Sequence, residues 1–174
     1  MQKGVVRKRR PRPLSEYGKQ LREKQDLKFQ YNLREKQFSN YVKAVLGKKR
    51  EGDTREAFLQ ELEKRLDSVV FRMGVAQTRK QARQMVSHRH FMVNGRPLNI
   101  ASYQVKIGDV ITPRKGSVDS ILFKHAQLGL KNYEVPSWMK LDKTKMEATI
   151  VTLPTMEEIA PTVDIPLIFE FYSR

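Results

Sequence analysis

The sequence contains no cysteine. Disulfide bonds and thiolate metal sites are therefore impossible, and cysteine usage gives no indication of the redox compartment. No apolar run approaches the ~18 residues that a transmembrane helix needs, and the N-terminus lacks the apolar stretch of a signal peptide, so no membrane partner is expected. Acidic residues are scarce: 19 Asp and Glu stand against 34 Lys and Arg, a net charge of +15.

This basic excess favours a polyanion as partner, most often a nucleic acid. The excess is concentrated in residues 1–50, which hold sixteen Lys and Arg against four Asp and Glu. We expect residues 1–13 to form an extended arm along phosphates, because its prolines disfavour a helix. Organelle targeting by this Arg-rich segment is an open alternative. The expected phosphate contacts of the arm are Arg7, Lys8, Arg9, Arg10 and Arg12.

The next fifty residues have the pattern of helices. The first helix is expected over residues 14–31 with Ser15 as its N-cap, and the second over 33–46, where the apolar residues fall on one face. Asp53 is the expected N-cap of a third helix. These helices are expected to form a core rather than a cofactor site.

Two short basic helices follow. In the first, Arg65 and Arg72 are two turns apart and are expected to project from the same side. In the second, Thr78 is the expected N-cap, and a helix N-terminus offers free N–H groups to an anion. Arg79, Arg83 and Ser87 follow one another at four-residue intervals, so we expect them to lie in a row on the outward face of this second helix.

A tight hairpin is expected after the helices. Asn94 and Gly95 are the preferred pair for a type I′ turn. A second strand pair is expected between residues 103–105 and 110–111. His88 and His90 lie nearby, but they lack the companion ligands of a metal site and are expected to pack or to touch phosphate instead.

These segments resemble a known family. RLDSVVFRMG, TRKQARQMVSH and MVNGRPLNIASYQVKIGDVI are similar to the RNA-binding domain named after ribosomal small-subunit protein four. That domain also occurs in pseudouridine synthases and tyrosyl-tRNA synthetases. The flanking segments LSEYGKQLREKQ, LREKQFSNY, PSWMKLD and VDIPLIFEFYSR resemble the ribosomal family itself, and the similarity runs from about Arg10 to the end.

The resemblance implies an α+β fold with three parts. Residues 14–63, completed by 137–174, are expected to form a helical domain. Residues 64–136 are expected to form an inserted RNA-binding module of two helices and a β-hairpin. The basic arm precedes both. Many bacterial relatives begin with a cysteine-bearing segment, which is sometimes a zinc knuckle, and this chain lacks it; no metal or cofactor is expected.

The implied function is that of a non-enzymatic constituent of the small ribosomal subunit. Such a protein binds the 5′ domain of 16S-type rRNA, nucleates assembly, and lies beside small-subunit ribosomal protein five, near the mRNA entrance. A bacterial cytoplasmic ribosome is the first expectation and an organelle ribosome the second. The family's RNA face, carried over to this sequence, comprises Arg65, Arg72, Thr78, Arg79, Arg83, Ser87, His88, Asn94 and Arg96.

An RNA-modifying or tRNA-acting enzyme that docks through the same module is the alternative. The sequence shows no paired carboxylates, Gly-rich phosphate loop or nucleophile–base spacing. The 63 residues before the module and the 38 after it leave little room for a catalytic pocket. Asp67, the only acid between Lys64 and Arg96, is expected to pair with an arginine rather than act on uridine. A free regulator that binds mRNA would use the same surface.

Overall fold

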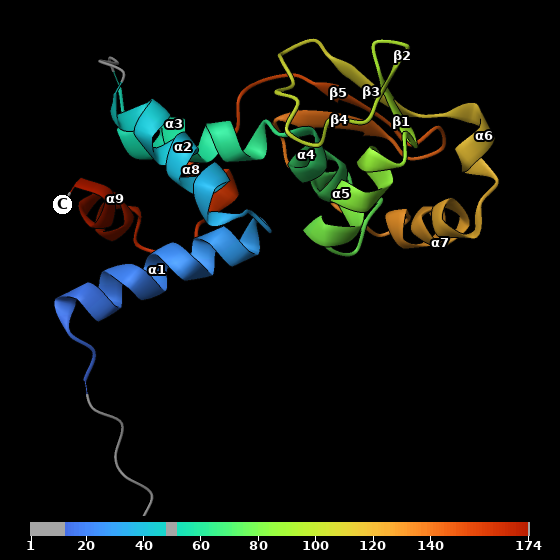
Figure 1. The fold of residues 1–174 in the computed structure, drawn as a ribbon. Helices are drawn as coiled ribbons and strands as arrows, with labels where there is room; N and C mark the ends of the chain where they lie inside the picture. Colours follow the sequence, from blue (N-terminus) through green and yellow to red (C-terminus); the bar gives the residue numbers. More distant parts are fainter. Residues whose placement is uncertain (1–12, 48–51, 174) are drawn as a thin grey trace, which may run out of the picture.

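The computed structural model describes residues 13–47 and 52–173. Figure 1 shows a group of helices on one side and a sheet with further helices on the other. The two groups have separate hydrophobic cores. The expected α+β class is therefore confirmed, and we refer to the groups as the helical half and the sheet half.

The helical half contains segments from both ends of the chain. Its elements are α1 (Glu16–Gln30), α2 (Glu35–Leu46), α3 (Thr54–Glu63), α8 (Met156–Ile159) and α9 (Ile165–Ser173). The expected N-caps are confirmed: Ser15 Oγ accepts from the amide of Gly18 at 3.2 Å, and Asp53 Oδ1 accepts from that of Arg55 at 2.9 Å. Each satisfies an amide that lacks a partner within its helix.

Aromatic contacts join the late helix α9 to the early helices. Phe58 of α3 lies edge-on to Phe38 of α2, with ring centroids 5.7 Å apart. It also lies edge-on to Phe169 of α9, with centroids 5.5 Å apart. Phe38 and Phe58 are fully buried. The core of the helical half is therefore complete only when α9 packs against it.

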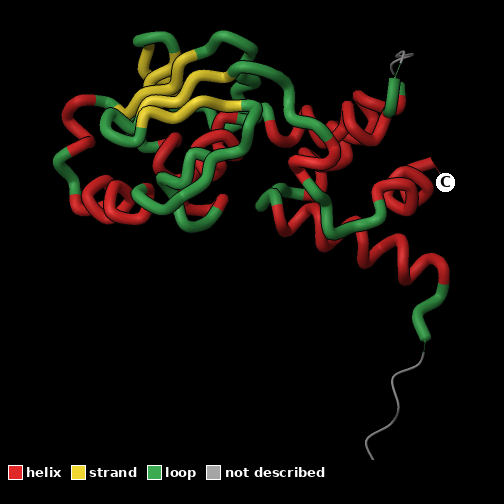
Figure 2. The backbone as a smooth tube through the Cα atoms, turned by 180° about the vertical axis from the view of Figure 1, so that it is seen from behind, coloured by secondary structure: helices red, strands yellow, loops and turns green. Residues whose placement is uncertain are grey.

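The sheet half is an antiparallel sheet with helices on one face, as the view from behind shows (Figure 2). Its elements are α4 (Leu66–Arg72), α5 (Arg79–Ser87), β1 (Phe91–Val93), β2 (Arg96–Leu98), β3 (Val110–Pro113), α6 (Lys115–Val118), α7 (Ile121–Leu130), β4 (Met139–Asp142) and β5 (Glu147–Ile150). The strand order is β2-β1-β3-β5-β4. Helices α4, α5 and α7 lie beneath this sheet in Figure 1.

The predicted hairpin is confirmed, but the prediction of a second strand pair between residues 103–105 and 110–111 is wrong. Asn94 and Gly95 have φ of 50° and 77°, the positive values that a type I′ turn requires. However, β3 pairs with β1 and β5, not with residues 103–105. The backbone of 103–105 is bonded to the start of α4 instead: the amide of Leu66 donates to the carbonyl of Tyr103, at 2.9 Å.

The sheet half also extends beyond the boundary expected at residue 137. Strand β5 pairs with β3, and β4 pairs with β5. Trp138, Met146 and Ile150 are buried in the core of the sheet half. The chain thus returns to the helical half only after Ile150, because the β4–β5 hairpin needs β3 as its neighbour. None of the helices in the described ranges is both long and apolar enough to span a membrane.

Candidate nucleic-acid interface

Two buried carboxylates lie where the halves meet. Glu63 ends α3 in the helical half, and Asp67 is in the first turn of α4 in the sheet half. Burying a carboxylate without a partner is costly, so such groups require cations or hydrogen-bond donors around them. Four arginines and one tyrosine supply these. We call the whole group the seam cluster: Tyr31, Glu63, Arg65, Asp67, Arg72, Arg79 and Arg83.

Glu63 binds groups from α4, from α5 and from the C-cap residue of α1. Its carboxylate accepts from Tyr31 Oη at 2.6 Å, from Arg72 Nη2 at 2.7 Å and from Arg79 Nη2 at 3.1 Å. Burial alone would raise the pKa of Glu63, but the Arg72 hydrogen bonds and the charges of Arg72 and Arg79 outweigh it and lower this pKa. Burial and the neighbouring Glu63 charge raise the pKa of Tyr31 well above its ordinary value. The site therefore holds an ionised carboxylate beside a neutral phenol.

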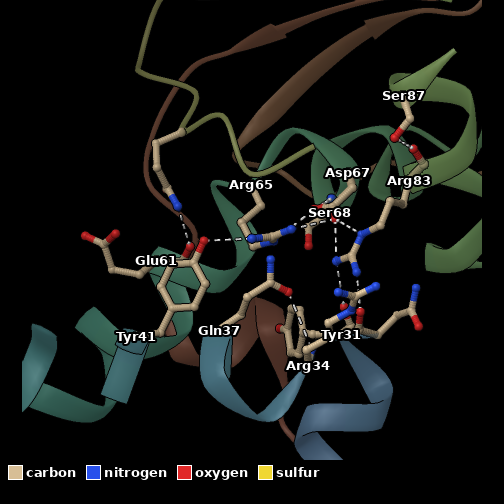
Figure 3. A network of polar contacts seen from close by, with 12 residues as sticks. Tyr31, Arg34, Gln37, Tyr41, Glu61, Arg65, Asp67, Ser68, Arg83 and Ser87 are labelled. Atoms are coloured by element: carbon tan, nitrogen blue, oxygen red, sulfur yellow. Dashed lines mark hydrogen bonds and ion pairs between the residues drawn. The ribbon is translucent and has the colours of Figure 1, made fainter. Parts of the chain in front are cut away.

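Asp67 binds two guanidinium groups, as Figure 3 shows. It accepts from Arg65 Nε and Nη2 at 3.0 and 2.7 Å, and from Arg83 Nε and Nη2 at 2.8 and 2.7 Å. Arg83 also donates to the backbone carbonyl of Asn32, just after α1. The expectation that Asp67 pairs with an arginine is confirmed. Arg83 therefore links Asp67 of the sheet half to the backbone of the helical half.

The expected outward projection of two arginines is wrong. The side chains of Arg65 and Arg79 are only 2% and 9% exposed. Arg79 lies between the rings of Tyr31 and Phe71, 4.3 and 4.6 Å from their centroids, a cation–π arrangement. Arg72 and Arg83 remain partly exposed, at 21% and 25%. Helical spacing identified a shared face of arginines but did not reveal that this face meets the helical half.

Three predicted residues with a hydroxyl or amide side chain also hydrogen-bond within the protein. Thr78 Oγ1 accepts from the amide of Gln81 at 3.1 Å, so Thr78 is the N-cap of α5 as expected. Ser87 Oγ donates to the carbonyl of Arg83 at 2.8 Å. The side chain of Asn94 binds both the Asp109 carboxylate and the Val110 amide, each at 2.9 Å. These hydrogen bonds stabilise the local backbone, and all three residues remain exposed at the surface.

The remaining predicted residues divide into two groups. His88 and Arg96 are exposed in the sheet half. The rings of His88 and His90 stack with centroids 6.1 Å apart, and His90 also bonds to Ser117 Oγ at 2.8 Å. Nowhere in residues 13–47 and 52–173 do three His, Asp or Glu side chains gather as a metal site would need. The predicted arm contacts Arg7, Lys8, Arg9, Arg10 and Arg12 lie outside the described residues.

A groove lies on the surface beside the seam cluster. One part, about 250 Å³, is lined by Arg34, Gln37, Arg65, Arg83, Ser87, Ala101 and Ser102. An adjoining part, about 430 Å³, shares three of these residues and adds Asn40, Tyr41, Ala44, Glu61 and Gln104. The groove therefore has one wall on α2 and another on the sheet half. Its amides, hydroxyls and guanidinium groups are the donors that phosphate and ribose accept from.

Sequence reasoning missed the α2 wall of this groove. Arg34 is exposed at the start of α2 and joins no ion pair among the described residues. Gln37 and Asn40 follow it one and two turns along the same helix. Their three-residue spacing is a sequence signal of a shared polar face. It was overlooked because the apolar stripe of α2 indicated only packing.

Comparisons with known proteins cover both halves. Residues 1–63 match the family model described as Ribosomal protein S4/S9 N-terminal domain, and residues 64–111 match the S4 domain. Small ribosomal subunit protein uS4 of Ligilactobacillus salivarius is 48% identical over 161 residues, which is 92% of this chain and 79% of the relative. The proteins of that name from Herminiimonas arsenicoxydans and Thermotoga petrophila are 46% and 44% identical, over 92% of this chain and 76% and 77% of their own.

Proposed function

This chain belongs to the family of small ribosomal subunit protein uS4, and from that premise we propose that it is a structural constituent of the small ribosomal subunit that binds rRNA. The relatives are named as ribosomal proteins, so the enzyme alternative has no support among them. The net charge of +15 suits a polyanion partner. The observation that carries the proposal is the groove between the halves, where Arg34 at the start of α2 and Arg83 of α5 line the same space.

The proposed RNA face is narrower than the one expected from sequence. It includes the partly exposed Arg72 and Arg83, together with the exposed Ser87, His88 and Arg96. Thr78 and Asn94 are exposed beside this face and complete it as hydrogen-bonding groups. Arg65 and Arg79 support the face from below. The arm of residues 1–13 adds phosphate contacts in this proposal.

The finer assignment follows the family resemblance. We propose the 5′ domain of 16S-type rRNA as the partner, with binding early enough to nucleate assembly of the subunit. Small-subunit ribosomal protein five and mRNA at its entrance are the proposed neighbours. Because the relatives reported above come from bacteria, the cytoplasmic ribosome is proposed ahead of an organelle ribosome.

Filter binding of the protein to a 5′-domain rRNA fragment tests the proposal. With some 6 to 10 phosphate contacts, affinity should fall by roughly 10³-fold or more between about 50 and 200 mM salt. A fragment of equal length from another rRNA domain is the matched control, and it should bind more weakly at both salt concentrations. Equal affinity for the two fragments would show that the protein binds RNA through charge alone and would overturn the assignment to the 5′ domain.

A further inference from the structure

The seam cluster is built from elements of both halves. Tyr31 and Glu63 contribute from the helical half, and the sheet half contributes Arg65, Asp67, Arg72, Arg79 and Arg83. Arg83 also binds the backbone carbonyl of Asn32 in the helical half. Tyr41 of α2 adds a further bond, since its hydroxyl accepts from Arg65 Nη1 at 2.7 Å. The polar bonds of this cluster thus cross between the halves at several points.

The carboxylates limit how much the arginines that they bind can contact RNA directly. A carboxylate beside a phosphate is repulsive, and it competes for the same guanidinium N–H groups. Arg65 directs all three of its nitrogens to Asp67 and Tyr41. Arg83 is partly exposed, so one side of it can still face RNA, but its nitrogens are directed to Asp67 and to backbone carbonyls after α1. The bonding capacity of these two cations is therefore mostly used inside the protein.

The groove depends on how the halves are held. Gln37 and Asn40 on α2 form one wall, and Ala101 and Ser102 of the sheet half form the other. Arg65 of the seam cluster lines both parts of the groove. If the halves shift, the distance between the walls changes, although each wall keeps its own structure.

We propose that Glu63 and Asp67 are positioning residues for RNA binding, which fix the sheet half against the helical half so that one RNA can contact both walls of the groove. This inference rests on the proposed rRNA-binding function. The proposed effect of the two acids is the reverse of what their charge alone would give: each carboxylate repels RNA, yet removing it weakens RNA binding.

The sign of the effect tests this role. Asp67→Asn and Glu63→Gln each add one positive unit to the net charge, which by electrostatics alone would strengthen RNA binding. We expect weaker binding instead, by about tenfold if only a tenth of the molecules keep the bound arrangement. Asp119→Asn and Glu134→Gln remove exposed carboxylates elsewhere and are the matched controls, in which affinity should stay equal or rise. All affinities are measured with the 5′-domain fragment at two salt concentrations, well below the melting temperatures.

A distance measurement supplies a second readout that loss of stability alone would not change. Because the chain has no cysteine, spin labels can be placed at Lys36→Cys on α2 and Lys140→Cys on β4 without other labelling sites. We expect one narrow distance distribution in the otherwise unchanged protein and a broad one in Asp67→Asn. If Asp67→Asn does not fold, Arg83→Lys replaces it, since lysine keeps the charge but cannot bind Asp67 through two nitrogens.

The outcomes separate the two proposals. If the unsubstituted protein does not bind the rRNA fragment, the proposed function fails and the positioning role falls with it. If that protein binds but Asp67→Asn and Glu63→Gln bind equally well or more tightly, rRNA binding stands and the positioning role is overturned. An unchanged, narrow distance distribution in both acid variants would overturn it as well. Weaker binding together with a broadened distribution supports it.

Discussion

Gly74 follows α4 at a point where a side chain has neither the backbone conformation nor the space it needs. Its φ is +76°, and a Cβ there would lie 2.7 Å from Cδ1 of Tyr133. Gly95 has nearly the same φ, +77°, but open space around it. A side chain would therefore meet the same unfavourable backbone conformation at both positions, but only at Gly74 would it also clash with a neighbouring residue.

Alanine substitutions at these positions should differ accordingly. Gly95→Ala should lower the free energy of unfolding by about 1–2 kcal/mol, the cost of a left-handed residue with a Cβ. Gly74→Ala should cost a further ~1–3 kcal/mol, because Tyr133 must move out of a packed site. Urea denaturation of both variants measures this. Equal losses would show that Tyr133 gives way freely and that the close approach does not matter for stability.

At this scale, the sequence predicted what depends on near neighbours in the chain. The type I′ turn at Asn94 and Gly95 and the N-cap at Thr78 follow from local backbone chemistry and are confirmed. The environment of Arg79 depends on Tyr31 and Phe71, which the fold brings together. No local pattern distinguishes an arginine that faces solvent from one held between two rings.

At the scale of the element, helix α5 should depend on its N-cap. Thr78→Ala removes the hydroxyl that accepts from the Gln81 amide, so we expect a loss of about 1 kcal/mol, within the usual ~0.5–2. Ser87→Ala is a control on the same helix, because it removes a hydroxyl that bonds only within its own turn; its cost should stay within about 0.5 kcal/mol. Thermal melting of both variants compares them, and a Thr78→Ala loss no larger than that of Ser87→Ala would contradict the capping role.

Helices were easier to predict than strands because each helix carries its own periodicity. The N-caps of α1 and α3 and the apolar stripe of α2 were visible in the sequence. Strands β4 and β5 have only four residues each, too few to show a clear alternation. The place of this hairpin in the sheet is fixed by the pairing of β5 with β3, which lies much earlier in the chain. The expected domain boundary therefore fell before this hairpin instead of after it.

At the scale of the whole molecule, Glu35 joins three helices of the helical half. Its carboxylate accepts from Lys24 of α1 at 2.7 Å, from Lys28 of α1 at 3.0 Å and from Tyr172 of α9 at 2.7 Å. Partial burial alone would raise the pKa of Glu35, but the hydrogen bonds from Lys24, Tyr172 and Lys28 outweigh it and lower this pKa to about 2. These bonds stabilise the fold only while the carboxylate is ionised.

The stability of the protein should therefore depend on pH in a defined range. The pKa of Glu35 is lower in the folded chain than its ordinary value of 4.5, so its contribution is present above about pH 4.5 and is lost as the pH falls towards 2. Glu35→Gln should lower stability at pH 7 and flatten the dependence across this range, whereas Glu134→Gln, an exposed control, should change neither. Urea midpoints at several pH values measure this, and a Glu35→Gln profile parallel to the unsubstituted one would refute the assignment.

The way the chain passes between the halves also sets an order for folding during synthesis. The sheet half is continuous in sequence and ends at Ile150, so all its strands and helices are available before α9 is made. The helical half begins first and is completed last, because Phe169 and Ile168 of α9 belong to its core. Until α9 emerges, the apolar faces of α2 and α3 lack their final cover. A nascent chain that stops after Ile150 would therefore carry a folded sheet half beside helices α1, α2 and α3, whose apolar faces are still exposed. Exposed apolar faces of this kind are what chaperones bind.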